Sequence, residues 1–240
     1  MLFVWCKVSF DEKRSHGSAV CETVYFFVEF VCVFPWKCVS LNNQNREKIM
    51  DGILRKLPIG IQTFEKLREG DYLYVDKTAL VWRIASTETP YFLSRPRRFG
   101  KSLLLSTFEA YFEGKKELFE GLAIADMEKE WKTYPVFHLD LNAEKYDSPQ
   151  ALVEILSRQL TQWELKYGKG EDEETLSGRF AGVIRRACEQ SGRGVVVLVD
   201  EYDKPLLQAL DDGTLLDDYR KTLKAFYGVL KSSDRYLRFV

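Results

Sequence analysis

From residue 51 onward, apolar and polar positions follow two different periods, which predicts a succession of strands and helices. Short apolar or alternating runs predict strands at residues 72–75, 91–93, 135–141 and 195–199, with another that begins at residue 236. Apolar positions three and four residues apart predict helices at residues 77–86, 101–112, 148–167, 175–191 and 215–230. This alternation is typical of an α/β protein in which helices cover both faces of a mostly parallel sheet.

The segment GVVVLVDEYDK at residues 194–204 combines an apolar run with two carboxylates. The run does not alternate, as expected for a strand that is buried on both faces. It ends in Asp200 and Glu201, which could hold a metal-bound water and polarise an attacking water, respectively. The structural alternative is a buried strand followed by a helix cap.

The segment SRPRRFGKS at residues 94–102 lies between a short apolar run and an amphipathic helix, as a Walker A phosphate-binding loop does. Gly100 lets the main chain approach phosphates, Lys101 supplies a positive charge, and Ser102 offers a hydroxyl to magnesium. The helix N-terminus adds free amides and its dipole. Arg95 replaces the usual opening glycine, but the following Pro96 favours an extended Arg95, as in the last residue of a strand.

These two motifs together predict a site for a nucleoside triphosphate and Mg²⁺, and the family resemblance described below implies that the nucleotide is ATP. They lie roughly 100 residues apart, with the predicted strand PVFHLDL at residues 135–141 between them. That order suits the P-loop ATPases in which a strand is inserted between the loop and the acidic strand. We therefore expect a three-layer P-loop NTPase sandwich.

The first 49 residues differ from the rest of the chain. Four of the five cysteines fall within residues 1–38, in a spacing that matches no zinc motif, and the chain has two histidines. The apolar run at residues 24–34 contains Glu29 and ends at Pro35, so it is shorter than the roughly 20 residues of a membrane-spanning helix. We expect Met50 to be the natural start and residues 1–49 to be a non-native extension. The alternative is an added β-hairpin or a membrane-associating segment.

Composition adds few constraints. The 240 residues include 35 basic and 36 acidic ones, so net charge gives no argument for a nucleic-acid or membrane partner. Such a partner would have to be bound by a local patch. The composition is that of a soluble protein, which we expect to be cytoplasmic.

Several long phrases resemble the bacterial AAA-ATPase-like family. They lie within residues 56–81, 91–114, 118–124, 134–141 and 199–206, and the resemblance covers about residues 53–240. In this family the loop reads RPRRFGKS, which implies that Arg95 is a variant rather than a defect. The family typically joins this module to a restriction-endonuclease-like nuclease domain. We therefore expect residues 50–240 to be an ATPase-like domain that is incomplete at its C-terminus.

The resemblance also assigns roles to individual residues. Nucleotide binding is expected of Arg95, Pro96, Arg97, Arg98, Phe99, Gly100, Lys101, Ser102 and Leu103, magnesium binding of Ser102 and Asp200, and catalysis of Glu201 and Lys101. Arg97 and Arg98 could touch phosphate, contact a neighbouring subunit in a homo-oligomer, or be solvated surface.

Four further positions have a functional and a structural interpretation. The segment Asp76-Lys77-Thr78 could lie near the nucleotide base or cap a helix. Asp203 and Lys204 could act as a sensor or form a local ion pair. His138 fits a core histidine, and Asp140, on the same strand face, could approach the site.

Three functions remain open from the sequence. The chain could be an ATPase that controls an attached or partner effector, such as a nuclease. It could be a nucleotide-binding scaffold that does not hydrolyse ATP. It could also be an inactive gene fragment without its nuclease domain.

Overall fold

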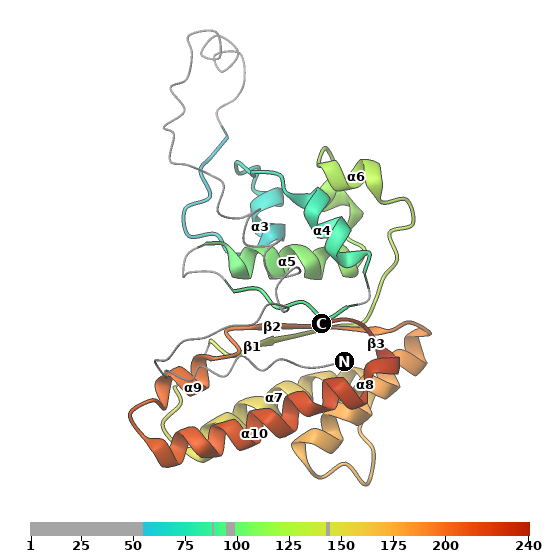
Figure 1. The fold of residues 1–240 in the computed structure, drawn as a ribbon. Coiled ribbons are helices and arrows are strands. Elements are labelled where there is room, and N and C mark those ends of the chain that lie inside the picture. Colours follow the sequence, from blue (N-terminus) through green and yellow to red (C-terminus); the bar gives the residue numbers. More distant parts are fainter. Residues whose placement is uncertain (1–54, 88, 95–98, 143–144) are drawn as a thin grey trace, which may run out of the picture. The chain divides into compact units, whose positions relative to one another are not determined.

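The computed structural model describes residues 55–87, 89–94, 99–142 and 145–240 (Figure 1). The predicted extension at residues 1–49 lies outside these residues. Within the described part, no helix is both long and apolar enough to cross a membrane.

A small parallel sheet lies at the centre of the described structure. Its strands β1 (Val136–Asp140), β2 (Val195–Asp200) and β3 (Leu237–Phe239) lie in the spatial order β1-β2-β3. β1 pairs with β2 along its whole length, whereas β3 pairs only with Val195 and Val196. The sequence prediction of an α/β protein with a parallel sheet is thus confirmed.

Helices make up most of the remaining structure. They are α3 (Phe64–Glu69), α4 (Thr78–Ala85), α5 (Lys101–Phe112), α6 (Ala123–Met127), α7 (Pro149–Tyr167), α8 (Leu176–Ser191), α9 (Lys204–Gln208) and α10 (Gly213–Ser232), with 3₁₀ turns η1 (Lys116–Phe119) and η2 (Asp234–Tyr236). The five predicted helices are present. The predicted start of α7 is also confirmed, because the Ser148 hydroxyl accepts a hydrogen bond from the Ala151 N–H and Pro149 occupies the first helical position.

Two predicted strands are wrong. Residues 72–75 form a single bridge, between Tyr72 and Lys56, and residues 91–93 form no strand. The Tyr91 N–H does donate to the Val240 carbonyl at 2.8 Å, so this segment runs beside the end of β3. A strand therefore does lie between the segment before the loop and the acidic strand, but it is β3 and not PVFHLDL. Sequence order could not show this, because β3 comes last in the chain.

Alternate side chains of β2 enter two hydrophobic clusters on opposite faces of the sheet. On one face Val195 and Val197 pack with α7, α8 and α10. On the other, Val196 and Leu198 pack with α3, α4, α5 and α6. Figure 1 shows these two helix layers on either side of the strands. Because both faces are covered, the strand does not need to alternate polar and apolar residues.

The segment between α7 and α8 is held by an ion pair. Arg186 donates to both carboxylate oxygens of Glu173 and to the Gly168 carbonyl, which ends α7. Glu173 reaches this position over Gly182 of α8. A methyl group built on Gly182 would lie 1.7 Å from the Glu173 carboxylate oxygen Oε1. The missing side chain at Gly182 is therefore required by the ion pair.

A second polar link joins the sheet to α5. Nδ1 of His138 on β1 lies 2.9 Å from Oε2 of Glu109 on α5. This hydrogen bond raises the pKa of His138, although burial acts in the opposite direction. His138 thus lies between sheet and helix, but 27% of its side chain is exposed, so the prediction of a core histidine holds only in part. Its ring atom Nε2 is buried with no hydrogen-bond partner among the described residues.

We expect Gly182→Ala to destabilise the protein by about 1–3 kcal/mol, because the methyl group displaces Glu173 and leaves Arg186 unpaired. The matched control is Gly228→Ala in α10, where an added Cβ has no atom within 4 Å. That change should stabilise the protein by about 0.5–1 kcal/mol, since alanine favours helix interiors. Urea unfolding measures both. In a Glu173→Ala background, the further change Gly182→Ala should increase the free energy of unfolding. If it still destabilises the protein there, the packing argument is contradicted.

The His138–Glu109 pair should make stability depend on pH. Because the folded-state pKa of His138 is raised, its contribution is fully present below the unfolded-state value of about 6.5 and is lost as the pH rises through the folded-state value. The difference in unfolding free energy between wild type and His138→Gln should therefore shrink from about pH 5.5 to 8.5. Glu109→Gln should remove this pH dependence. If the difference in unfolding free energy between wild type and His138→Gln did not change with pH, the His138–Glu109 pair would not be ionic.

Candidate functional site

Two carboxylates lie side by side at the carboxyl edge of the sheet. Asp140 ends β1, Asp200 ends β2, and the two are direct partners in the register of the strands. Asp200 is buried, and its Oδ1 accepts the Glu201 N–H at 2.9 Å. Asp140 is exposed and accepts the Asn142 N–H at 2.8 Å. The register thus places Asp140 beside the acidic strand end, as its shared strand face with His138 suggested.

Glu201, directly after β2, has a left-handed main chain with φ of 52°. A non-glycine residue in this conformation is strained, and such residues concentrate at functional sites. The Glu201 carbonyl accepts the Lys204 N–H at 3.0 Å, which joins the strained turn to the start of α9. The turn directs the chain sharply away from β2 and leaves the Glu201 side chain half-buried.

The start of α5 lies toward the same edge of the sheet. At the other end of this helix, the Phe112 carbonyl accepts the N–H of Tyr134, which precedes β1. Since Glu109 meets His138 midway, α5 runs antiparallel to β1. Along the axis of α5, the helical rise per residue places Lys101 about 12 Å from Glu109. Along β1, the strand rise places Asp140 about 7 Å from His138. The first turn of α5 therefore extends roughly 5 Å beyond the strand ends, with the positive end of its dipole at this edge.

The loop before α5 is described in part. Arg95, Pro96, Arg97 and Arg98 lie outside the described residues, so their predicted contacts remain predictions. Gly100 precedes α5 in the left-handed conformation, with φ of 73°, and an added Cβ there would have no atom within 4 Å. Lys101, Ser102 and Leu103 form the first turn of α5, and the Lys101 side chain makes no hydrogen bond or ion pair with a described residue.

Aromatic side chains join the two predicted motifs. The rings of Phe92, before the loop, and Tyr202, after Glu201, meet edge to face with their centroids 5.3 Å apart. The exposed fractions are 67% for Phe92 and 39% for Tyr202, so both rings lie at the surface. The sequence analysis did not select either residue. The apolar residue before the loop and the aromatic residue after the acidic pair were the available signals.

The segment Asp76-Lys77-Thr78 forms a structural cap. Asp76 accepts hydrogen bonds from Thr78 at the start of α4 and from the Ala123 N–H at the start of α6. Burial disfavours the ionised carboxylate, but these hydrogen bonds outweigh it and lower the pKa of Asp76. Thr78 in turn accepts the Ile124 N–H at 3.1 Å. The helix-cap interpretation is therefore supported.

The local ion pair suggested for Asp203 and Lys204 is wrong. The Lys204 ammonium instead donates to the carbonyl and to the side-chain oxygen of Asn142, the latter at 2.9 Å. Asn142 follows β1 and donates its N–H to Asp140. Lys204 therefore connects the segments that follow the two acidic strand ends.

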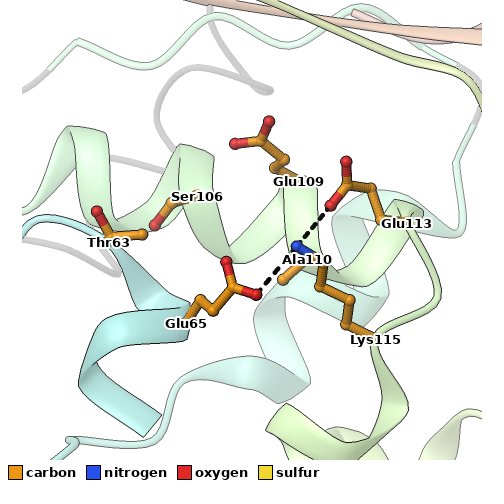
Figure 2. Close-up of a pocket in the computed structure, with 7 residues that line it drawn as sticks. All are labelled: Thr63, Glu65, Ser106, Glu109, Ala110, Glu113 and Lys115. Carbon is orange, nitrogen blue, oxygen red and sulfur yellow. Dashed lines mark hydrogen bonds and ion pairs between the residues drawn. The ribbon is translucent and has the colours of Figure 1, made fainter. Parts of the chain in front are cut away.

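A separate pocket of about 180 Å³ lies on the side of α5 that faces α3 (Figure 2). In Figure 2 the Lys115 ammonium lies between the carboxylates of Glu65 and Glu113, at 3.2 and 2.9 Å. The pocket is lined by Thr63, Glu65, Ser106, Glu109, Ala110, Glu113 and Lys115. None of these residues belongs to the predicted site. The third carboxylate of the lining, that of Glu109, pairs with His138 rather than with Lys115.

Comparison with known proteins places this chain in a family. A family model described as "Predicted AAA-ATPase" (AAA-ATPase-like) matches residues 58–240. The chain is 42% identical over 186 residues to a protein of Azotobacter chroococcum mcd 1 that is named "Uncharacterized protein in vnfD 5'region". This alignment covers 77% of the chain and 36% of the relative, so the chain spans little more than a third of the relative's length. No solved structure matches the chain. The family match includes every helix and strand described above, and the chain belongs to the AAA-ATPase-like family.

Proposed function

We propose that this chain is a P-loop module that binds ATP and hydrolyses it with Mg²⁺. The contact of Phe92 with Tyr202 is the observation that supports the proposal best, because it places the residues that enter the loop beside the turn after the acidic strand. A phosphate loop and an acidic strand end act on one nucleotide only if they meet at the same edge of the sheet.

The strand order agrees with this proposal. In the P-loop ATPases named above, a strand is inserted between the loop and the acidic strand. Here β3 occupies that place, between β2 and the segment of Tyr91. This order, together with Gly100 at the N-cap of α5, supports the finer fold that we propose, a P-loop NTPase sandwich.

The residues of the site suit the phosphates of ATP. The amides of the first turn of α5 and the Lys101 ammonium attract negative charge toward the helix N-terminus. The left-handed Gly100 gives the main chain close access, since an added Cβ would occupy open space rather than protein. The phosphates would thereby lie over the carboxyl edge of the sheet, where β1 ends at Asp140 and β2 ends at Asp200.

The residues also fit a magnesium ion. Mg²⁺ prefers oxygen ligands and keeps several waters, so a single hydroxyl and a single carboxylate are sufficient protein groups. Ser102 would supply the hydroxyl, and Asp200, whose Oδ1 is engaged by the Glu201 N–H, would supply its second oxygen. When bound, the ion would neutralise charge that develops on the phosphates. The described residues contain no group of three or more His, Cys, Asp or Glu side chains arranged for a metal.

Glu201 would act as the general base. Its carboxylate would orient a water for in-line attack on the γ-phosphorus and accept a proton from that water. The bond between the γ-phosphorus and the β–γ bridging oxygen would break, and ADP would leave. The strained main chain supports this role, because the turn fixes where the side chain leaves β2.

Effector control is a further part of the proposal. The relative is much longer than this chain, and the family resemblance suggests a nuclease domain as the effector. ATP hydrolysis would then switch an effector that is attached to this module or bound to it.

Two variants separate binding from hydrolysis. Lys101→Ala should weaken magnesium-dependent ATP binding about 10- to 100-fold, because a charged hydrogen bond is lost. Glu201→Gln should keep ATP affinity but lower kcat about 10²- to 10⁴-fold. Calorimetry and phosphate release measure these effects, and exposed Lys77→Ala is the matched lysine control. Wild-type protein without ATP affinity would refute the nucleotide site; binding without turnover would favour the non-hydrolytic scaffold.

Strain at Glu201 makes a separate prediction about stability. Both Glu201→Gly and Glu201→Gln should strongly lower kcat, but only glycine relieves the left-handed main chain. We expect Glu201→Gly to be about 1 kcal/mol more stable to urea unfolding than Glu201→Gln. Equal stabilities would show that the main chain at this residue is not strained.

A further inference from the structure

Tyr134 lies at the amino edge of the sheet, just before β1, and two guanidinium groups lie near its ring. The Cζ atoms of Arg193 and Arg238 are 5.5 and 5.8 Å from the ring centroid. The ring itself is fixed, because it packs edge to face on Phe112 and its main-chain N–H donates to the Phe112 carbonyl. Two positive charges are therefore held near one aromatic ring.

Arg238 reaches this position through an irregularity in the sheet. The pairing of β3 with β2 changes from Val195–Leu237 to Val196–Phe239, so Arg238 is the extra residue of a β-bulge. Bulges redirect side chains. The Arg238 guanidinium donates to the carbonyls of Ala85 and Thr87 at the end of α4, at 2.7 and 3.1 Å. Its charge therefore meets main-chain oxygens rather than a carboxylate.

Arg193 precedes β2, and its side chain has no hydrogen bond or ion pair with any described residue. Its nitrogen Nη1 is buried without a partner. A buried donor without an acceptor is unfavourable and requires an explanation, which an unseen anion or water commonly provides. The orphaned donor lies on the residue that shares Tyr134 with Arg238.

The nearby charges are also unbalanced. Lys132, two residues before Tyr134, is paired with Glu130. This hydrogen bond raises the pKa of Lys132, while Arg193 acts in the opposite direction through its charge. Glu128 accepts the Tyr111 hydroxyl at 2.5 Å. Lys132 is balanced by Glu130, and the ionised Glu128 offsets part of the charge of the two guanidiniums, which leaves a local excess of about one positive charge among the described residues.

We propose that Arg193 and Arg238 form an oxyanion site around Tyr134 for a phosphate group. A phosphate carries a charge of about −1.5 to −2 at neutral pH and three acceptor oxygens, which suit the unpartnered Arg193 donor and the positive charge of Arg238. A carboxylate has only two acceptor oxygens and a single charge. The site lies at the amino edge of the sheet, about 20 Å along β2 from Asp200, and is independent of the proposed ATP site.

The test uses inorganic phosphate as the probe and Lys101→Ala as the parent protein, so that the loop before α5 loses its main phosphate-binding charge. At constant ionic strength, phosphate should raise the unfolding temperature in a saturable way. Arg193→Gln in the same parent should weaken this response about 10- to 100-fold. Each variant is compared with itself in phosphate-free buffer, so a change in its basal stability does not affect the result.

Two controls make the outcome specific. Arg235→Gln removes a neighbouring guanidinium that lies over Tyr236 instead of Tyr134, and it should leave the phosphate response unchanged. Acetate at the same concentration should give a weaker response than phosphate. The proposal is overturned if phosphate gives no saturable shift or if Arg193→Gln keeps it. An acetate response as strong as that of phosphate would refute the assignment to phosphate.

Discussion

Burial of β2 on both faces is the constraint on which the described structure depends. Each fully buried Val or Leu contributes about 1.5–3 kcal/mol, and successive residues of this strand supply both hydrophobic clusters. Both helix layers pack on this strand: α7, α8 and α10 use one set of β2 side chains, and α3 to α6 use the other. The same strand fixes the position of Asp200, because a shift by one residue would exchange the two sets of side chains.

The sequence predicted the elements whose local signals agree with their burial. The helix at residues 101–112 and the strand that ends at Asp200 were found because apolar spacing, glycine and carboxylates lie within a few residues of each other. Residues 72–75 alternate like a strand, but Leu73 and Val75 are exposed. The only bridge that this segment makes in the described structure joins Tyr72 to Lys56. Short helices such as α3 and α6 depend on distant partners, for example the bond between Asp76 and Ala123, which no local pattern contains.

The site shows the same division. Residue types and spacing selected Gly100, Lys101 and Asp200 as candidates, because phosphate and metal chemistry restrict which side chains can serve. They did not identify Phe92 with Tyr202 or the link from Lys204 to Asn142, since these depend on which strand ends are neighbours. Similarly, Arg193 and Arg238 are distant in sequence from Tyr134, and the bulge that brings Arg238 to the ring follows from tertiary pairing. A sequence pattern can identify reactive residues within one segment, whereas the order of the strands determines which segments lie together.

The cluster beneath α5 has a consequence for synthesis of the chain. Its helices lie between residues 64 and 124, but the strands that cover their apolar faces include Val196, Leu198 and Phe239. At about 5–20 residues per second, the ribosome needs on the order of 10 s to make the intervening chain. During that time Phe108 and Phe112 cannot make their ring contacts with Phe239. The nascent chain therefore presents an aromatic surface that either chaperones protect or neighbouring chains can capture.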